Sequence, residues 1–156
     1  MNTATLPYAI SPVAAVVDQL REANWVVTLP GESLTVRVRS EDVGNRYTIM
    51  DSIVQPATSS PLHYHAEEEI FRVLEGVATF MLDGKLVDAG PDTVIVVPAG
   101  MTHAWKNASD KPVRLSTTFI PGGIERLFEQ MGGKSPEELG ILAQTYGTVI
   151  VGPPLA

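Results

Sequence analysis

The clearest fold signal in this chain is the stretch Phe80-Met81-Leu82-Asp83-Gly84-Lys85-Leu86-Val87. Two apolar segments flank Asp83-Gly84, a dipeptide that favours a two-residue β-hairpin turn because both residues tolerate a positive φ. Further runs rich in Val, Ile, Thr and Phe, separated by turn residues at close intervals, extend on both sides of this hairpin. This pattern is typical of an all-β sandwich or barrel. The predicted strands are 25–29, 34–39, 46–55, 62–65, 69–74, 77–82, 85–88, 93–97, 103–107 and 113–119.

Helix signals lie on either side of these strands. Ser11-Pro12 followed by Val13 to Ala23 predicts a short amphipathic helix, although the β-branched residues at its start are also compatible with a strand. Ile124 to Met131 carries apolar residues on one helical face. Ser135-Pro136-Glu137-Glu138 is a capping box that begins a second helix, which runs through Tyr146. We expect a single domain over residues 1–156, with a β-barrel at about 25–120 and C-terminal helices at about 123–146.

Composition excludes several classes of function. The 156 residues carry a formal net charge of −7 and contain no block of Lys or Arg, which argues against a nucleic-acid partner. The chain has no cysteine, so any bound metal must be held by nitrogen and oxygen donors. No apolar run is long enough to span a membrane, and the first ten residues lack the features of a secretory signal. We therefore expect a cytoplasmic protein with no membrane partner.

All three histidines fall in two short segments, 63–69 and 98–107. His63 and His65 are two residues apart, so in a strand their imidazoles point to the same face. Glu69 and His103, on neighbouring strands, would complete a set of three imidazoles and one carboxylate. Such a set suits one divalent first-row transition metal, and Fe, Mn, Ni, Co, Zn and Cu all remain open. Because only neutral imidazole coordinates, we expect metal affinity to fall below about pH 6.

These two segments resemble the two signature motifs of the cupin superfamily. The first motif is matched by His63, His65, Glu69 and Gly76, and the second by Pro98, Gly100, His103 and Asn107. Two positions depart from the pattern, because Ala57 and Asp92 stand where the motifs begin with glycine. Both are turn positions, so the departures affect loop shape and not the ligands. The segments 119–128 and 146–154 are similar to the tails of single-domain bacterial cupins described as quercetin-dioxygenase-like.

The resemblance implies a fold, a cofactor and an activity. The fold is mainly β, a cupin-type double-stranded β-helix, or jelly-roll barrel, with short helices at the N-terminus and the C-terminus. One metal is held inside by His63, His65, Glu69 and His103, usually in a homodimer. The implied activity is that of a dioxygenase acting on a small aromatic, flavonol-like or enediol substrate. In this interpretation Glu69 also serves as a general base toward a coordinated hydroxyl.

Two other functions remain open at this point. The same metal site could polarise a carbonyl without using oxygen, as in an isomerase or lyase. The barrel could also be a non-enzymatic module that binds or senses a small molecule. One barrel fold hosts many chemistries, so the fold alone does not decide between these functions.

Overall fold

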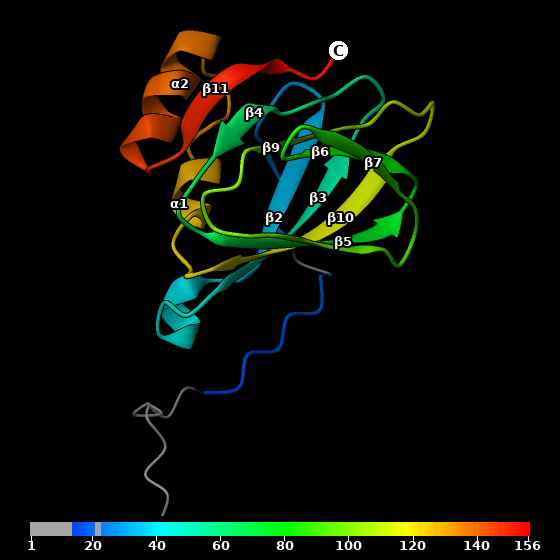
Figure 1. The fold of residues 1–156 in the computed structure, drawn as a ribbon. Coiled ribbons are helices and arrows are strands. Elements are labelled where there is room, and N and C mark those ends of the chain that lie inside the picture. Colours follow the sequence, from blue (N-terminus) through cyan, green and yellow to red (C-terminus); the bar gives the residue numbers. More distant parts are fainter. Residues whose placement is uncertain (1–13, 21–22) are drawn as a thin grey trace, which may run out of the picture.

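The computed structural model describes residues 14–20 and 23–156. Its main body consists of two antiparallel sheets that pack face to face (Figure 1). The six-stranded sheet has the order β1-β2-β3-β10-β5-β8, and the five-stranded sheet has the order β11-β4-β9-β6-β7. The strands of the first sheet are β1 (Val26–Val27), β2 (Glu32–Val38), β3 (Thr48–Val54), β10 (Val113–Ile120), β5 (Glu68–Glu75) and β8 (Val94–Val97). Those of the second are β11 (Val149–Pro154), β4 (Pro61–Tyr64), β9 (His103–Lys106), β6 (Ala78–Leu82) and β7 (Lys85–Ala89).

The predicted mainly β, jelly-roll fold is confirmed. Each of the ten predicted strands has a counterpart, and the end of the chain adds an eleventh, β11. The central hairpin forms as predicted, since Leu82 pairs with Lys85 and the two turn residues both have positive φ, 47° for Asp83 and 80° for Gly84. The strand predicted at 25–29 is reduced to the two residues of β1.

The predicted N-terminal helix is wrong for the part of it that the structure describes. Residues 14–20 are not helical, and Ser11 to Val13 and residues 21–22 lie outside the described residues. An amphipathic helix of this length depends on a surface that covers its apolar face. Here Val16 and Val17 are exposed, and Leu20 adopts a φ of 60°, which a right-handed helix does not allow.

The interior contains two apolar clusters. The larger one lies between the two sheets and includes Phe71, Phe80, Trp105 and Leu115. The second joins β2, β3 and β10 to the C-terminal helices through Leu34, Met50, Phe119, Ile124 and Leu127. Burial of this apolar surface supplies the main favourable term for folding.

Two helices follow β10 in the sequence, namely α1 (Glu125–Phe128) and α2 (Pro136–Thr145). The chain then forms β11, which pairs with β4. The predicted capping box is confirmed: the Ser135 hydroxyl accepts from the Glu138 amide, and the Glu138 carboxylate accepts from the Ser135 amide. The helix predicted over Ile124 to Met131 is shorter than expected, because only Glu125–Phe128 form α1.

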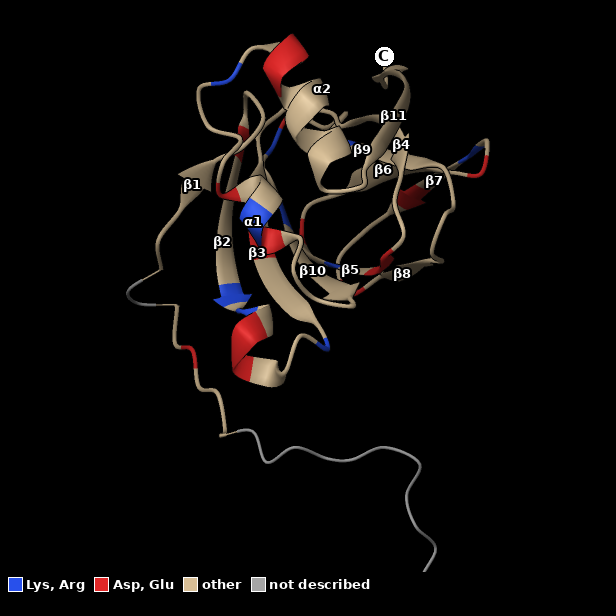
Figure 2. Cartoon of the chain, turned by 90° about the vertical axis from the view of Figure 1, so that its left-hand side faces the viewer, with Lys and Arg blue, Asp and Glu red and all other residues tan. Residues whose placement is uncertain are grey.

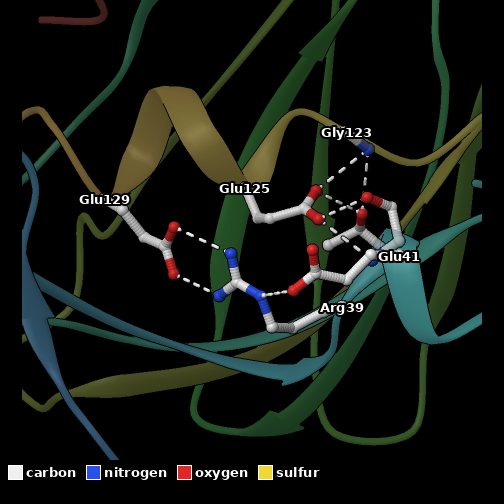
Figure 3. A network of polar contacts seen from close by, with 7 residues as sticks. Arg39, Glu41, Gly123, Glu125 and Glu129 are labelled. Atoms are coloured by element: carbon white, nitrogen blue, oxygen red, sulfur yellow. Dashed lines mark hydrogen bonds and ion pairs between the residues drawn. The ribbon is translucent and has the colours of Figure 1, made fainter.

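A buried carboxylate fixes α1 to the barrel. Glu125 is 1% exposed, and its two oxygens accept four hydrogen bonds, from the Ser40 amide and hydroxyl, the Thr48 hydroxyl and the Gly123 amide (Figure 3). These donors outweigh the effect of burial and lower the pKa of Glu125 to about 2. Ser40 begins the short 3₁₀ helix η1 (Ser40–Val43), so this network ties α1 to the segment between β2 and β3.

Acidic and basic residues lie close together in the region around β2, η1 and α1 (Figure 2). One example is Arg39, which is paired with both Glu41 and Glu129 (Figure 3). None of the described helices has the length and apolar character needed to cross a bilayer.

Candidate metal centre

The four predicted donors come from both sheets. His63 on β4 and His103 on β9 are direct cross-strand partners in the five-stranded sheet. His65 directly follows β4, and its carbonyl accepts a hydrogen bond from the Gly100 amide of the second motif. Glu69 lies on β5 in the opposite sheet. The candidate centre therefore forms only when the two sheets face each other.

The structure brings one potential donor atom from each of these residues to within 4.8 Å of the others. His65, Glu69 and His103 are almost fully buried, and His63 is half-buried. Donors bound to one ion at about 2.1 Å lie at most about 4.2 Å apart, so a contraction of a few tenths of an ångström would close the set. Three imidazoles and a carboxylate at these separations fit a divalent transition metal.

Each imidazole is oriented by its own backbone neighbourhood. Nδ1 of His63 lies 2.7 Å from the Pro61 carbonyl, Nδ1 of His65 lies 3.0 Å from the Glu67 carbonyl, and Nδ1 of His103 lies 2.8 Å from the Met101 carbonyl. A carbonyl oxygen can only accept, so in each ring Nδ1 carries the proton and donates it. The remaining nitrogen, Nε2, then has a lone pair in the neutral ring. This tautomer is the one that a metal-binding histidine needs.

The arrangement of Nε2 atoms around Glu69 requires a cation. Oε2 of Glu69 lies 2.8 Å from Nε2 of His103 and 3.1 Å from Nε2 of His65. A neutral imidazole lone pair and a carboxylate oxygen are both acceptors and repel each other at this distance. Either a proton or a metal ion must stand between them. The cluster could thus bind a metal ion in place of the protons.

The pKa values of Glu69, His63 and His65 are set by burial and by the contacts within this cluster. Burial raises the pKa of Glu69, but hydrogen bonds from His103 and His65 outweigh it and lower the pKa to about 2. Burial and the neighbouring charge of His103 lower the pKa of His63 to about 4. For His65, burial lowers the pKa, but the hydrogen bond to Glu69 and its charge outweigh this effect and raise it. At neutral pH, His63 is therefore neutral and Glu69 is ionised.

A cavity of about 550 Å³ opens beside this cluster. His63, His65 and Glu69 form part of its wall, and most of the remaining lining is apolar. Its size is in the range of pockets that take drug-sized organic molecules. Leu127 and Phe128 line the cavity and also pack in the second apolar cluster.

The neighbouring motif residues occupy supporting positions. Phe71 and Val73 share the face of Glu69 on β5, and Trp105 shares the face of His103 on β9. All three are buried in the main core. Asn107 stabilises a turn: its side-chain amide donates to the carbonyls of Val54 and Lys111, and its Oδ1 accepts from the Ser109 amide and hydroxyl.

The two departures from the motifs occur at positions with a glycine-like backbone. Ala57 has a φ of 62° and Asp92 a φ of 67°. The chain therefore keeps the left-handed turns that glycine would adopt without strain, and it does so with residues that favour them less.

Sequence reasoning missed an ionisable group in the cavity wall, Glu32. This carboxyl group is 6% exposed and lines the same cavity as Glu69. Burial is the main reason that its pKa rises to about 7, and the charge of Glu69 adds to the effect. Its sequence context, between a turn and the predicted strand at 34–39, resembles an exposed strand start. The alternation of β2 was the available signal, because it places Glu32 on the inward face with Leu34.

Comparison with known proteins agrees with this geometry. Residues 50–120 match a family model described as a cupin domain. No curated protein matches the chain. Many solved structures share its fold. The polyketide cyclase RemF from Streptomyces resistomycificus matches with a TM-score of 0.61 at 22% identity, over 69% of this chain and 80% of that one.

Two further solved structures match this chain over nearly the whole of their own length. KdgF from Halomonas sp. matches with a TM-score of 0.65 at 15% identity, over 72% of this chain and 99% of that chain. A predicted oxalate decarboxylase from Thermotoga maritima matches with a TM-score of 0.60 at 21% identity, over 68% and 99%. At these identities the likeness concerns the fold. The match to a cupin domain over residues 50–120 and these shared folds agree with the two-sheet architecture described above.

Proposed function

We propose that this protein is a metal-dependent enzyme of the quercetin-dioxygenase-like type, acting on a small aromatic, flavonol-like or enediol substrate. His63, His65, Glu69 and His103 would hold one divalent transition metal. The observation that carries the proposal is the juxtaposition of three Nε2 atoms, oriented by backbone carbonyls, with a buried carboxylate at the wall of an apolar cavity. A metal there would supply Lewis-acid and redox chemistry toward a chelating substrate and O₂.

The residues of the chain would supply binding, proton transfer and exclusion of water. The apolar wall, with Phe119 and Phe128 in contact at a ring-centroid distance of 5.8 Å, suits a flat aromatic molecule. The helices α1 and α2 contribute apolar side chains to the cavity wall, and these would exclude water from a bound substrate. Glu69 is ionised at neutral pH and is the group proposed to accept the proton of a substrate hydroxyl.

Oxygen consumption tests the reaction. The metal-free protein is loaded separately with Fe(II), Mn(II), Ni(II) or Co(II) and mixed with flavonols and catechols in an oxygen-electrode cell. We expect O₂ uptake that depends on the metal and is lost in His103→Ala. Turnover of the same compounds without O₂, or uptake that is unchanged in His103→Ala, would contradict a dioxygenase that uses this site.

The comparisons favour one alternative reaction class. A polyketide cyclase and a predicted oxalate decarboxylase share this fold, which keeps metal-dependent isomerase or lyase chemistry without O₂ as the second candidate. Anaerobic turnover of an aromatic or enediol substrate by the metal-loaded protein would select it. Binding of such molecules with no turnover under any metal would instead indicate a small-molecule-binding or sensor barrel.

We also propose that residues 1–156 act as one domain and that two copies form a homodimer. Val94 and Val96 are exposed on the edge strand β8, and Leu86 and Val87 are exposed on the edge strand β7. Cover of these edges by a second copy would remove apolar surface from water. Sedimentation at micromolar concentration gives a dimer mass if this is correct and a monomer mass if it is not. The cytoplasmic location stays a prediction from the sequence.

A further inference from the structure

Four polar residues cross the floor of the cavity in a diagonal row. Glu69 on β5, Thr117 on β10, Ser52 on β3 and Glu32 on β2 are all at most 7% exposed, and all line the cavity. The row therefore has a candidate metal ligand at one end and a second, unassigned carboxyl group at the other. We refer to these four residues as the polar diagonal.

The strand register places the four side chains on one face. Glu69 pairs with Phe119, so Thr117, two residues away, is its diagonal neighbour on β10. Ser52 pairs with Leu115 and is therefore the diagonal neighbour of Thr117 on β3. Residues opposite or two apart share a face of a sheet, and diagonal neighbours lie about 7–8 Å apart.

The last step of the polar diagonal follows in the same way. Ser52 also pairs with Leu34 on β2, so Glu32, two residues before Leu34, is its diagonal neighbour on that strand. The charge of Glu69 contributes to the raised pKa of Glu32, which indicates that the two ends act on each other across the cavity.

Glu32 is held in place by the turn that precedes β2. Its Oε2 accepts a hydrogen bond of 2.6 Å from the hydroxyl of Thr28, which is also buried. The Glu32 amide donates to the Leu29 carbonyl, and the Thr28 amide donates to the Glu32 carbonyl. The carboxyl group therefore has a fixed position in a mostly apolar wall. Burial of a carboxyl group there is unfavourable in the absence of a polar partner from the cavity.

We propose that Glu32 contacts the substrate: its carboxyl group binds a second hydroxyl group of a polyoxygenated aromatic molecule whose first oxygens chelate the metal at Glu69. The inference rests on the proposed function and names the substrate feature that the cavity selects. The polar diagonal then follows one edge of the bound molecule, and the apolar walls contact its faces. Glu32 is accordingly a specificity-determining residue at the end of the cavity away from the metal.

The test is an anaerobic binding titration, followed by absorbance, of the Ni(II)-loaded full chain. The probes are 3-hydroxyflavone, which has a chelating hydroxyl–carbonyl pair alone, and its 7-hydroxy and 4′-hydroxy derivatives. In the unchanged protein, at least one derivative is expected to bind roughly tenfold more tightly than 3-hydroxyflavone, the effect of about one charge-assisted hydrogen bond. Glu32→Leu is expected to abolish this gain and to leave the Kd of 3-hydroxyflavone within about twofold of the original value.

Two further variants separate contact from structural support. Glu32→Gln preserves the shape of the side chain and keeps an oxygen for Thr28, and it should retain part of the gain. Thr28→Val removes the hydrogen bond that positions Glu32 but leaves the carboxylate, so it should weaken the gain less than Glu32→Leu does. A merely structural role of Glu32 would instead weaken the binding of all three probes together.

The outcomes distinguish the two proposals. If 3-hydroxyflavone shows no nickel-dependent binding, the proposed function fails for this substrate class, and the role of Glu32 fails with it. If 3-hydroxyflavone binds but neither derivative gains affinity, or if the gain persists in Glu32→Leu, the role of Glu32 is wrong and the proposed function stands.

Discussion

Replacement of Glu32 by Gln is expected to stabilise the metal-free protein, by an amount that depends on pH. The buried carboxyl has its pKa raised from 4.5 to about 7, so the folded state resists its ionisation. Below pH 4.5 the group is neutral in both the folded and the unfolded state and contributes no difference. As the pH rises from 4.5 to 7, the unfolded chain loses this proton and the folded chain keeps it, so the stability of the native protein falls.

The magnitude follows from the interval between the two pKa values. About two and a half pH units at roughly 1.4 kcal/mol each give about 3 kcal/mol as the full cost of the ionised carboxyl above pH 7. Glu32→Gln removes this cost, because the amide does not ionise and keeps an oxygen for the Thr28 hydroxyl. We therefore expect the variant to gain up to about 3 kcal/mol over the native protein at pH 8, and almost nothing at pH 4.5.

Urea unfolding at pH 4.5, 6, 7 and 8, followed by tryptophan fluorescence, measures the difference. Trp105 is buried in the main core and reports on its opening. Glu41→Gln is the matched control, because that carboxylate is exposed on η1 and its replacement should give a small difference with little pH dependence. A gain from Glu32→Gln that is constant across this range, or a loss that grows with pH, would show that ionisation of Glu32 does not destabilise the folded protein.

Three further predictions concern stability. Ala57→Gly is expected to raise the free energy of unfolding by about 0.5–1 kcal/mol in urea titrations, because it relieves a φ of 62°. Ala108 has no positive φ, so Ala108→Gly should lower the free energy of unfolding. Equal effects of the two substitutions would contradict this explanation. Glu125→Ala removes the acceptor of the Ser40 amide, the Ser40 hydroxyl and the Thr48 hydroxyl, while the Gly123 amide keeps the Thr48 oxygen as an acceptor, and it should cost about 3–5 kcal/mol by thermal unfolding. Glu129→Ala, which removes an exposed ion pair, should cost less than about 1 kcal/mol. Comparable losses would argue against the network. Ser135→Ala should cost about 1 kcal/mol, measured by circular dichroism during urea unfolding, and no loss would mean that the capping box is dispensable.

The strands and the convergence of the four candidate donors could be predicted because their signals are local. Alternation with period two fixes which residues share a face, and Asp83-Gly84 fixes one hairpin outright. The prediction that His103 meets His63 and His65 at one site needed one further assumption, namely that the strands of the two motifs are neighbours. The structure confirms this for His63 and His103, which are direct cross-strand partners, whereas Glu69 lies on β5 in the opposite sheet and not on a neighbouring strand.

The features that sequence reasoning missed depend on contacts between distant segments. The polar diagonal becomes visible only when the register of β2, β3, β10 and β5 is known, because each of its members looks ordinary in its own strand. Glu125 was assigned to a helix, but three of its four donors come from Ser40 and Thr48, which lie 85 and 77 residues earlier. The N-terminal helix failed for the same reason, since local amphipathicity does not provide a surface to pack against.

The central claim is that four side chains close around a single cation. Its most direct test is the metal content of the protein purified from its own host, measured by elemental analysis, alongside the metal affinity of single-donor variants. We predict about one transition-metal ion per chain, retained after dialysis at pH 7.5, and a loss of affinity of at least about tenfold in His63→Ala, His65→Ala, Glu69→Ala and His103→Ala. Metal binding that is undiminished in these variants, or no binding by the native protein from any of the divalent ions offered, would contradict the account.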